Sequence, residues 1–220
     1  REFKAIGVDY PTGTVAAQCL YNTGICYFKM HLFEEAENQF QQLLSRFGSH
    51  QLAPRSMFLR ALTYLERKDS RRAEKLLRGF IQAHRRHEWA GIAYEKLGDA
   101  YTDLESPGKA ADAYEQAARQ SRNAREQIEA RYKLAGAYAE LDNAPRAAKE
   151  YRQIISLGEK RGVFMRVPDS YYRLADYEYE QKKYASALDY YKQATRKYTG
   201  FQETPWGLFQ IGNCHKNLKQ

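Results

Sequence analysis

The chain repeats its own pattern every 37 residues. One position of the pattern, usually tyrosine, occurs four times at this interval, then after a step of 40 residues and again after 37. These positions are Tyr27, Tyr64, Tyr101, Tyr138, Glu178 and His215. A fixed period of this length indicates a stack of similar units, none of which can bury its apolar face alone. An extended binding surface is therefore a better expectation than a catalytic site.

Each unit contains two blocks of apolar and small residues at spacings of three and four, which place them on one stripe of a helix. The clearest copy is YEKLGDAY at 94–101, followed by Ala110, Tyr114 and Ala117. Short polar breakers such as Asp142-Asn143 separate the blocks, so each unit is predicted to be a helical hairpin. Small residues recur where the two helices would cross closely: Gly24, Ala61, Gly98, Ala135, Ala175 and Gly212.

This pattern resembles that of the tetratricopeptide repeat (TPR) family, and the resemblance covers essentially the whole chain. It implies an all-α fold, a right-handed α-solenoid of antiparallel helix pairs that forms a single array. The array starts and ends in mid-unit, so its unmatched terminal half-repeats are candidates for self-association. The implied division is 1–13 for the second helix of a preceding repeat, 14–50, 51–87, 88–124, 125–164 and 165–201 for full repeats, and 202–220 for the first helix of a further repeat.

Three places depart from the family pattern. Arg60 and Arg131 stand where the second and fourth units should carry an apolar residue. In the fifth unit Tyr177 and Glu178 look exchanged relative to the expected order. We expect this exchange to rotate or loosen that helix locally.

The units are about one helical turn longer than is usual in the family. The connectors at 47–56 and 198–207 carry a proline near the start of the following helix, where its missing N–H is tolerated. In this respect the chain is similar to the TPRs of bacterial envelope proteins, such as Tol-Pal accessory factors and outer-membrane assembly lipoproteins. That similarity implies a location in the periplasm or cell envelope. No apolar run approaches the roughly 20 residues that cross a bilayer, so no transmembrane segment is expected.

No feature of the sequence indicates an enzyme. There is no glycine-rich phosphate loop, nucleophile elbow or CxxC pair. His84 and His87 flank two arginines, which would repel a metal ion. We therefore expect no catalytic residue, no cofactor and no metal site. Cys19, Cys26 and Cys214 occupy positions that the family fills with small buried residues, so we expect them to be core thiols.

Positive charge is concentrated between Glu66 and His87, where eight Lys/Arg and three acidic residues give a net charge of +5. The segment is either a solvated face or a contact for an anionic partner or lipid headgroups. It has no interleaved aromatic residues and no nucleic-acid motif, so nucleic acid is not an expected partner. The candidate residues of this basic surface are Arg67, Lys68, Arg71, Arg72, Lys75 and Arg78.

In a TPR array one face of the first helices lines a concave groove. Here that face is apolar and aromatic in the first two units, whereas its fifteen positions in the next three units hold eight acids and no Lys or Arg. Polar groove residues can simply keep an array soluble, but a cluster of one sign without a local counter-charge also attracts the opposite charge. The candidate partner-binding residues are Tyr21, Ile25, Phe28, Phe58, Leu62, Glu95, Asp99, Asp103, Tyr132, Glu140, Tyr172, Asp176, Tyr179 and Glu180.

The sequence therefore predicts a non-catalytic scaffold that binds a basic segment of a protein or peptide partner in an acidic, tyrosine-containing groove. Two alternatives stay open. One is a scaffold for envelope polysaccharide export that contacts glycan or its secretion machinery, because acids among tyrosines and tryptophans (Trp89 and Trp206) also suit sugar hydroxyls. The other is a self-assembling scaffold that stacks through its terminal half-repeats.

Overall fold

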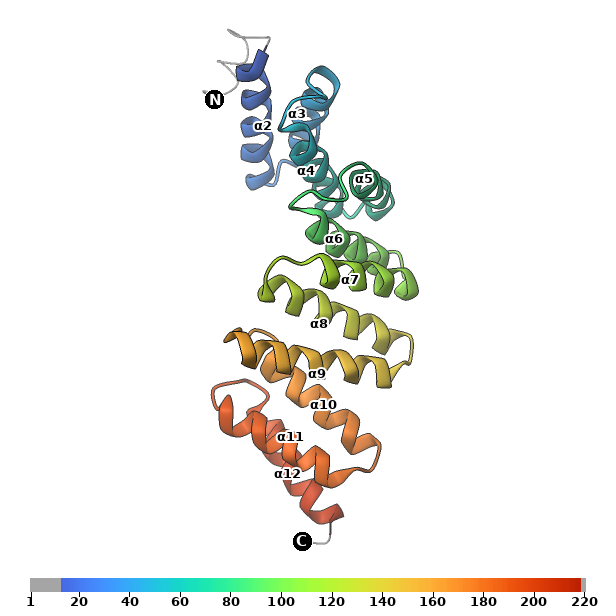
Figure 1. Cartoon of the computed structure of the whole chain (residues 1–220), viewed down its shortest axis with the longest axis vertical. Coiled ribbons are helices and arrows are strands. Elements are labelled where there is room, and N and C mark those ends of the chain that lie inside the picture. Colours follow the sequence, from blue (N-terminus) through green and yellow to red (C-terminus); the bar gives the residue numbers. More distant parts are fainter. Residues whose placement is uncertain (1–12, 219–220) are drawn as a thin grey trace. The chain divides into compact units, whose positions relative to one another are not determined.

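Every regular element of the computed structural model is an α-helix within residues 13–218, the part of the chain that the structure describes. The predicted all-α fold is confirmed, and the helix expected within 1–13 falls largely outside the described residues. The eleven helices are α2 (Gly13–Lys29), α3 (Phe33–Arg46), α4 (Ala53–Glu66), α5 (Ser70–Ala83), α6 (Ala90–Asp103), α7 (Pro107–Gln120), α8 (Ala124–Glu140), α9 (Ala144–Arg161), α10 (Val167–Glu180), α11 (Tyr184–Lys197) and α12 (Thr204–Asn217) (Figure 1).

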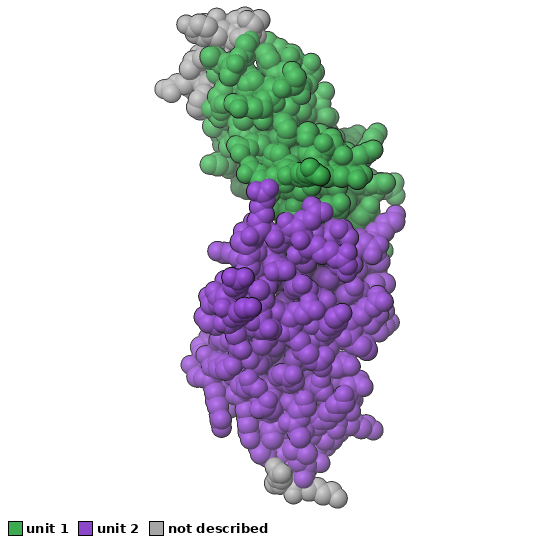
Figure 2. Space-filling model, in the orientation of Figure 1, with its two compact units in different colours: residues 1–106 green, residues 107–220 purple. Residues whose placement is uncertain are grey.

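The helices belong to two compact units, residues 1–106 and residues 107–220 (Figure 2). Within unit 1 each helix packs against the next, from α2 on α3 to α5 on α6. Within unit 2 the same holds from α7 on α8 to α11 on α12. Each unit is therefore a stack of antiparallel neighbouring helices, as the repeat predicts.

The turn after each first helix has one recurring conformation. In each turn one residue is left-handed, and the backbone N–H of the next residue donates to the carbonyl of the Tyr or Glu that recurs in every repeat, which we call the repeat-marking residue. One example is Asp69 N to Tyr64 O at 2.9 Å. This is the closing bond of a Schellman turn, so the repeat-marking residue also accepts the bond that ends its helix. Non-glycine residues with φ between 51° and 60° occupy these turns: His31, Lys68, Glu105, Asp142 and Lys182.

The step of 40 residues arises in α9, which has 18 residues, whereas α11 has 14. The longer helix ends at Gly162, whose φ of 67° is left-handed. Just before this end Gly158 is buried against the start of α10, where an added Cβ would lie 2.3 Å from Cγ2 of Val167. The extra turn of α9 therefore depends on a glycine for its packing.

Small residues lie at close helix crossings, with one exception. An added Cβ at Gly24 would lie 2.6 Å from the ring of Phe40, and Ala61 and Ala135 are fully buried. Gly212 is exposed, and an added Cβ there would meet nothing within 4 Å. The prediction of a close crossing at Gly212 is wrong because, among the described residues, no helix follows α12 to pack on that face.

The three departures from the repeat pattern are accommodated by ion pairs with the neighbouring second helix. The pairs are Arg60–Glu37 at 2.7 Å, Arg131–Glu150 at 2.6 Å and Glu178–Arg152 at 2.6 Å. Glu178 is 5% exposed, and α10 continues unbroken past it to Glu180. The expected loosening is therefore not observed, because the pair with Arg152 holds the carboxylate against α9.

Most positions predicted as core are buried. Tyr64 and Tyr101 are buried and Tyr27 is half-buried, and the thiols of Cys19 and Cys214 are also inside. Cys26 is exposed, which corrects its prediction as a core thiol. It lies on a side of α2 that no other described helix covers.

Candidate functional site

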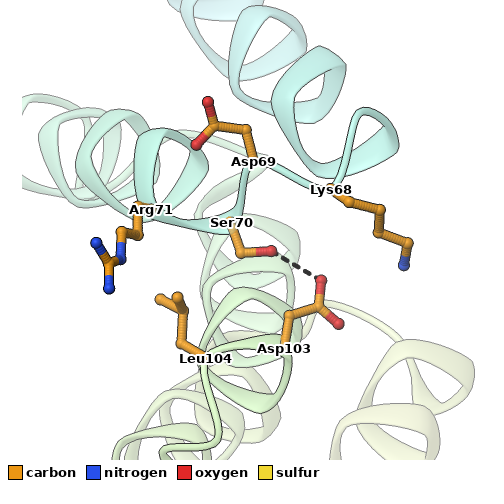
Figure 3. Close-up of a pocket in the computed structure, with 6 residues that line it drawn as sticks. All are labelled: Lys68, Asp69, Ser70, Arg71, Asp103 and Leu104. Atoms are coloured by element: carbon orange, nitrogen blue, oxygen red, sulfur yellow. Dashed lines mark hydrogen bonds between the residues drawn. The ribbon is translucent and has the colours of Figure 1, made fainter.

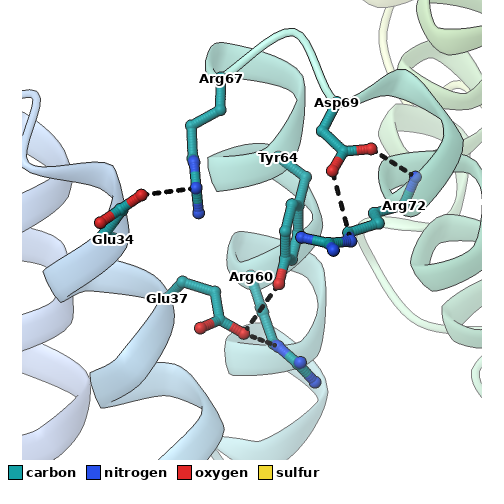
Figure 4. A network of polar contacts seen from close by, with 7 residues as sticks. All are labelled: Glu34, Glu37, Arg60, Tyr64, Arg67, Asp69 and Arg72. Atoms are coloured by element: carbon teal, nitrogen blue, oxygen red, sulfur yellow. Dashed lines mark hydrogen bonds and ion pairs between the residues drawn. The ribbon is translucent and has the colours of Figure 1, made fainter.

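The predicted basic surface, which lies in the turn between α4 and α5 and along α5, is partly neutralised by unit 1 itself. Three of its six cations are in ion pairs: Arg67–Glu34 at 2.6 Å, Arg72–Asp69 at 3.3 Å and Arg78–Glu74 at 3.4 Å. Arg67 and Arg72 also lie over the ring of Tyr64, each 5.7 Å from its centroid (Figure 4). Among the described residues, Lys68, Arg71 and Lys75 have no ion-pair partner. The surface thus offers about half of the predicted free charge.

A pocket of about 640 Å³ in unit 1 joins residues that the sequence assigns to two different surfaces. It is lined by Lys68, Asp69, Ser70, Arg71, Asp103 and Leu104 (Figure 3). The hydroxyl of Ser70 donates to Oδ2 of Asp103 at 2.8 Å, which ties the end of α6 to the start of α5. Two cations and two carboxylates share this pocket, so it has no strong preference for ligand charge.

The acidic residues of α6 have a counter-charge on their own helix. The ammonium group of Lys96 lies 2.8 Å from Oδ2 of Asp99 and 3.6 Å from Oε1 of Glu95. All three side chains are about one-third exposed or less. The expectation that the acidic face lacks a local counter-charge is therefore wrong in unit 1, because Lys96 reaches across that face.

The aromatic residues predicted for the groove of unit 1 are largely core residues. Tyr21 is buried with its ring 6.3 Å from that of Phe40, and Phe58 is buried 5.6 Å from Phe80 and 5.3 Å from Trp89. These contacts correct the prediction that Tyr21 and Phe58 form an accessible floor. Ile25, Phe28 and Leu62 are half-buried and retain some accessible surface.

A second counter-charge lies beside the acidic face in unit 2. Arg166, just before α10, donates two hydrogen bonds of 2.9 Å to the carboxylate of Glu129 and lies 4.5 Å from the ring centroid of Tyr132. Burial and the nearby carboxylate of Asp169 raise the pKa of Tyr132 to about 12. Asp169 in turn has Arg173 at 3.6 Å. Glu129 of α8 and Asp169 of α10 are therefore paired, not free.

Two more predicted groove residues have structural roles. Tyr172 is 2% exposed and stacks on Phe201 with ring centroids 6.1 Å apart, so it is corrected from a ligand-binding residue to a core residue. Tyr179 is half-buried, and its hydroxyl accepts a hydrogen bond of 2.9 Å from the side chain of Asn217 on α12. Tyr179 therefore braces the last helix.

Two of the remaining predicted acids, Asp176 and Glu180, line one hollow of about 330 Å³ formed by α8, α9 and α10. We call it the acidic hollow; it is lined by Ala139, Asp142, Ala144, Ala147, Ala148, Tyr151, Arg173, Asp176, Tyr177 and Glu180. Three carboxylates face one guanidinium across a floor of alanines and tyrosine rings. Asp176 is held in place by the hydroxyl of Tyr191, which donates to it from α11. Glu140, on the same predicted face, is exposed but does not line the hollow.

A hollow of opposite charge was not predicted from the sequence. We call it the basic hollow; it measures about 460 Å³ and is lined by Gln127, Arg131, Lys149, Arg152, Gln153, Ser156, Leu157 and Lys160, all from α8 and α9. The available signals were Arg131 at an apolar position and the three- and four-residue spacings on α9. They are easily missed because Glu150 and Glu159 alternate with the basic residues along α9.

Other classes of site receive no support from the described residues. From Gly13 to Leu218, no three side chains of the metal-binding types gather closely enough to hold an ion. Over the same range, none of the helices combines the length and apolarity that crossing a bilayer requires.

Comparison with known families assigns the repeat. Residues 21–88, 60–125, 95–162 and 132–200 each match the family described as tetratricopeptide repeat. The four matches overlap and together cover most of the chain. A search of curated protein sequences finds no match.

Solved structures show the same fold at low sequence identity. The apo form of RapI aligns with a TM-score of 0.77 and 14% identity, covering 99% of this chain and 68% of that one. YrrB, described as a TPR protein with an unusual peptide-binding site, aligns at 0.66 and 15%, covering 93% and 96%. PilF from Pseudomonas aeruginosa aligns at 0.65 and 14%, covering 93% and 85%.

Proposed function

We propose that this chain, which belongs to the tetratricopeptide repeat family, is a non-catalytic scaffold that binds a basic segment of a protein partner. Proteins of this family generally act as protein-interaction scaffolds. The observation that carries the more specific proposal is the acidic hollow of unit 2. The peptide-binding site of YrrB, a protein of similar fold, is consistent with such a use of the repeat.

The acidic hollow suits a lysine or arginine side chain. The aliphatic stem of such a side chain would pack on the alanines and on Tyr177, while its charged end meets the carboxylates of Asp142, Asp176 and Glu180. Arg173 opposes a cation, but Asp169 lies 3.6 Å behind it and offsets part of its charge. Because two of the three carboxylates are exposed, screening by salt should weaken binding markedly at physiological ionic strength, where the Debye length is ~8 Å.

The experiment compares short peptides that carry Lys or Arg with matched peptides that carry norleucine or citrulline, using fluorescence anisotropy at two salt concentrations. Asp142→Asn combined with Glu180→Gln should weaken binding of the charged peptides about three- to tenfold, as expected for two partly exposed ion pairs. Glu140→Gln is the control, because it removes a neighbouring exposed acid outside the hollow. Equal binding of charged and neutral peptides, or an equal effect of Glu140→Gln, would refute the proposal.

Self-association is a second candidate function, and the exposed end of α12 favours it. Trp206, Leu208 and Phe209 are 48%, 59% and 60% exposed, and the rings of Trp206 and Phe209 lie 5.8 Å apart. Large apolar side chains gathered on one surface often mark a contact with another protein. Sedimentation at increasing concentration should reveal larger species that Trp206→Ala with Phe209→Ala abolishes.

A scaffold for envelope polysaccharide export is less well supported as an alternative. Stacking on sugar rings requires an accessible aromatic face. Trp89 packs against Phe58 and lies beneath the guanidinium of Arg55 at 5.3 Å, so it is already engaged. Trp206 is 48% exposed, whereas Trp89 is only half-buried and already has ring contacts. A location in the periplasm or cell envelope stays a prediction from the connectors.

A further inference from the structure

The charged residues that line the basic hollow are all cations. Arg131, Lys149, Arg152 and Lys160 line it, and no acidic side chain does. The other polar lining groups are the amides of Gln127 and Gln153 and the hydroxyl of Ser156 (amides and a hydroxyl can donate hydrogen bonds). The chemistry of the lining therefore matches an anion. The α9 residues that line the basic hollow differ from the alanines of α9 that line the acidic hollow.

The two arginines are held in place before any ligand arrives. Arg131 donates to Glu150 at 2.6 Å and to Oε1 of Gln153, and Arg152 donates to Glu178 at 2.6 Å. The side chains of Glu150 and Glu178 are only 10% and 6% exposed, so these carboxylates anchor the guanidinium groups from the protein side. A guanidinium has five N–H donors, so each arginine keeps donors for an anion on its open side.

The two lysines have no such anchor. Lys149 and Lys160 are exposed, and neither has a hydrogen-bond or ion-pair partner among the described residues. Glu150 and Glu178 offset part of the charge of the two arginines, whereas the charges of the two lysines are not offset in this way. An anion that enters the hollow would therefore reduce the repulsion among the cations as well as gain attraction.

The dimensions of the hollow favour an extended ligand over a single small ion. Lys149 and Lys160 are eleven residues apart on α9, which separates their backbones by ~16 Å at 1.5 Å per residue. A lone phosphate or carboxylate reaches only part of that length. Leu157 adds an apolar contact within the lining, which suits a peptide better than a purely ionic ligand.

We infer that the basic hollow is a second binding site, which takes an extended acidic peptide segment rich in Asp or Glu. Its carboxylates would pair with the anchored guanidinium groups of Arg131 and Arg152, and Lys149 and Lys160 would meet further carboxylates along α9. This site is separate from the acidic hollow, so a partner with both signs of charge could engage both. Its existence does not depend on the proposal for basic segments.

The experiment uses the whole chain and a fluorescent peptide of alternating Glu and Gly, with the same peptide carrying Gln for Glu as the neutral probe. Lys149→Gln with Lys160→Gln should weaken binding of the Glu peptide about three- to tenfold, as expected for two exposed ion pairs. Neither lysine has a partner within the described part of the chain, so the substitutions should not disturb the fold. Circular dichroism should give the same melting temperature for the variant and the parent.

The matched control is Arg71→Gln with Lys75→Gln on α5, which removes the same charge from exposed residues without an ion-pair partner among those described. The inference is supported when only the α9 variant weakens binding and the Gln peptide does not bind. It is overturned when both variants weaken binding equally, because net charge then explains the effect. It is also overturned when inorganic phosphate or vesicles with anionic lipid bind at this site and the Glu peptide does not.

Discussion

Glu178 of α10 and Arg152 of α9 form an ion pair of 2.6 Å in which the carboxylate side is 6% exposed and the arginine side 47%. In earlier repeats the equivalent first-helix position is tyrosine, and the hydroxyl of Tyr64 donates to Glu37 of the preceding helix at 3.2 Å. The fifth repeat therefore retains a polar bridge between the same two helices but places the acid on the first helix and the donor on the second. The exchange preserves the connection between neighbouring helix pairs.

Replacing Glu178 by Gln should lower the free energy of unfolding by about 1–3 kcal/mol, the usual range for a hydrogen bond to a charged group in a largely buried position. Urea unfolding followed by circular dichroism measures the change. A double-mutant cycle with Arg152→Met isolates the pair. The comparison variant is Glu115→Gln, whose partner Arg119 is 64% exposed; it should change stability by less than about 0.5 kcal/mol. Equal effects at both positions would show that burial does not strengthen the Glu178 pair.

The repeat was predictable because each helix buries one stripe, and the spacing of Ala, Tyr and Leu reports that stripe directly. Gly24 and Ala61 illustrate this, since small residues were expected at the crossings where the structure places them. The charged residues Arg60, Arg131 and Glu178 were also visible in the sequence as departures from the repeat pattern. Their partners were not, because Glu37 and Glu150 lie 23 and 19 residues from the arginines they bind, and repeat spacing alone does not report cross-helix distances.

The candidate site was less predictable for the same reason. The sequence counts acids on a helix face, but it does not show that Lys96 and Arg166 reach over that face from positions just outside it. Likewise, helical spacing assigns both Tyr132 and Tyr172 to the groove face of the first helices. In the structure Tyr132 is half-buried, whereas Phe201 covers Tyr172. Which positions are accessible depends on how far neighbouring side chains extend and on which residues the connectors cover. Neither of these properties repeats every 37 residues.

The left-handed residues at the turns offer a stabilising change. Lys182 has a φ of 58°, a region that is unfavourable for residues with a Cβ, so Lys182→Gly should raise the free energy of unfolding by roughly 0.5–1 kcal/mol. Thermal melts of the variant and the parent measure the effect. Lys183, the next residue, has a φ of −86°, and Lys183→Gly should not stabilise. If both variants are destabilised, relief of turn strain is not the controlling factor.

Two glycines in helices should respond in opposite directions to alanine. Gly24→Ala places a Cβ 2.6 Å from the ring of Phe40, so we expect a loss of about 1–3 kcal/mol through overpacking. Gly136→Ala on α8 meets nothing within 4 Å and should stabilise by up to about 1 kcal/mol, because alanine is the better helix former. Urea midpoints of the two variants decide the matter, and a stabilising Gly24→Ala would mean that Phe40 moves aside at little cost.

Glu159 should make the stability of unit 2 depend on acid pH. Hydrogen bonds from Lys197 and from the hydroxyl of Tyr171, both 2.7 Å from Oε1, lower the pKa of this carboxyl below its usual value. A depressed pKa means that the folded state favours the ionised form, so the stabilisation is present above the unfolded pKa of ~4.3 and is lost as pH falls below it.

Because 37% of the Glu159 side chain is exposed, the effect should be no more than about 1 kcal/mol. Glu159→Gln should therefore lower the melting temperature at pH 7 and have little effect at pH 3. Glu140→Gln is the control, because Glu140 is exposed and has no hydrogen bond of this kind to any described residue. A Glu159→Gln penalty that persists unchanged at pH 3 would show that shape, not charge, is what the site requires.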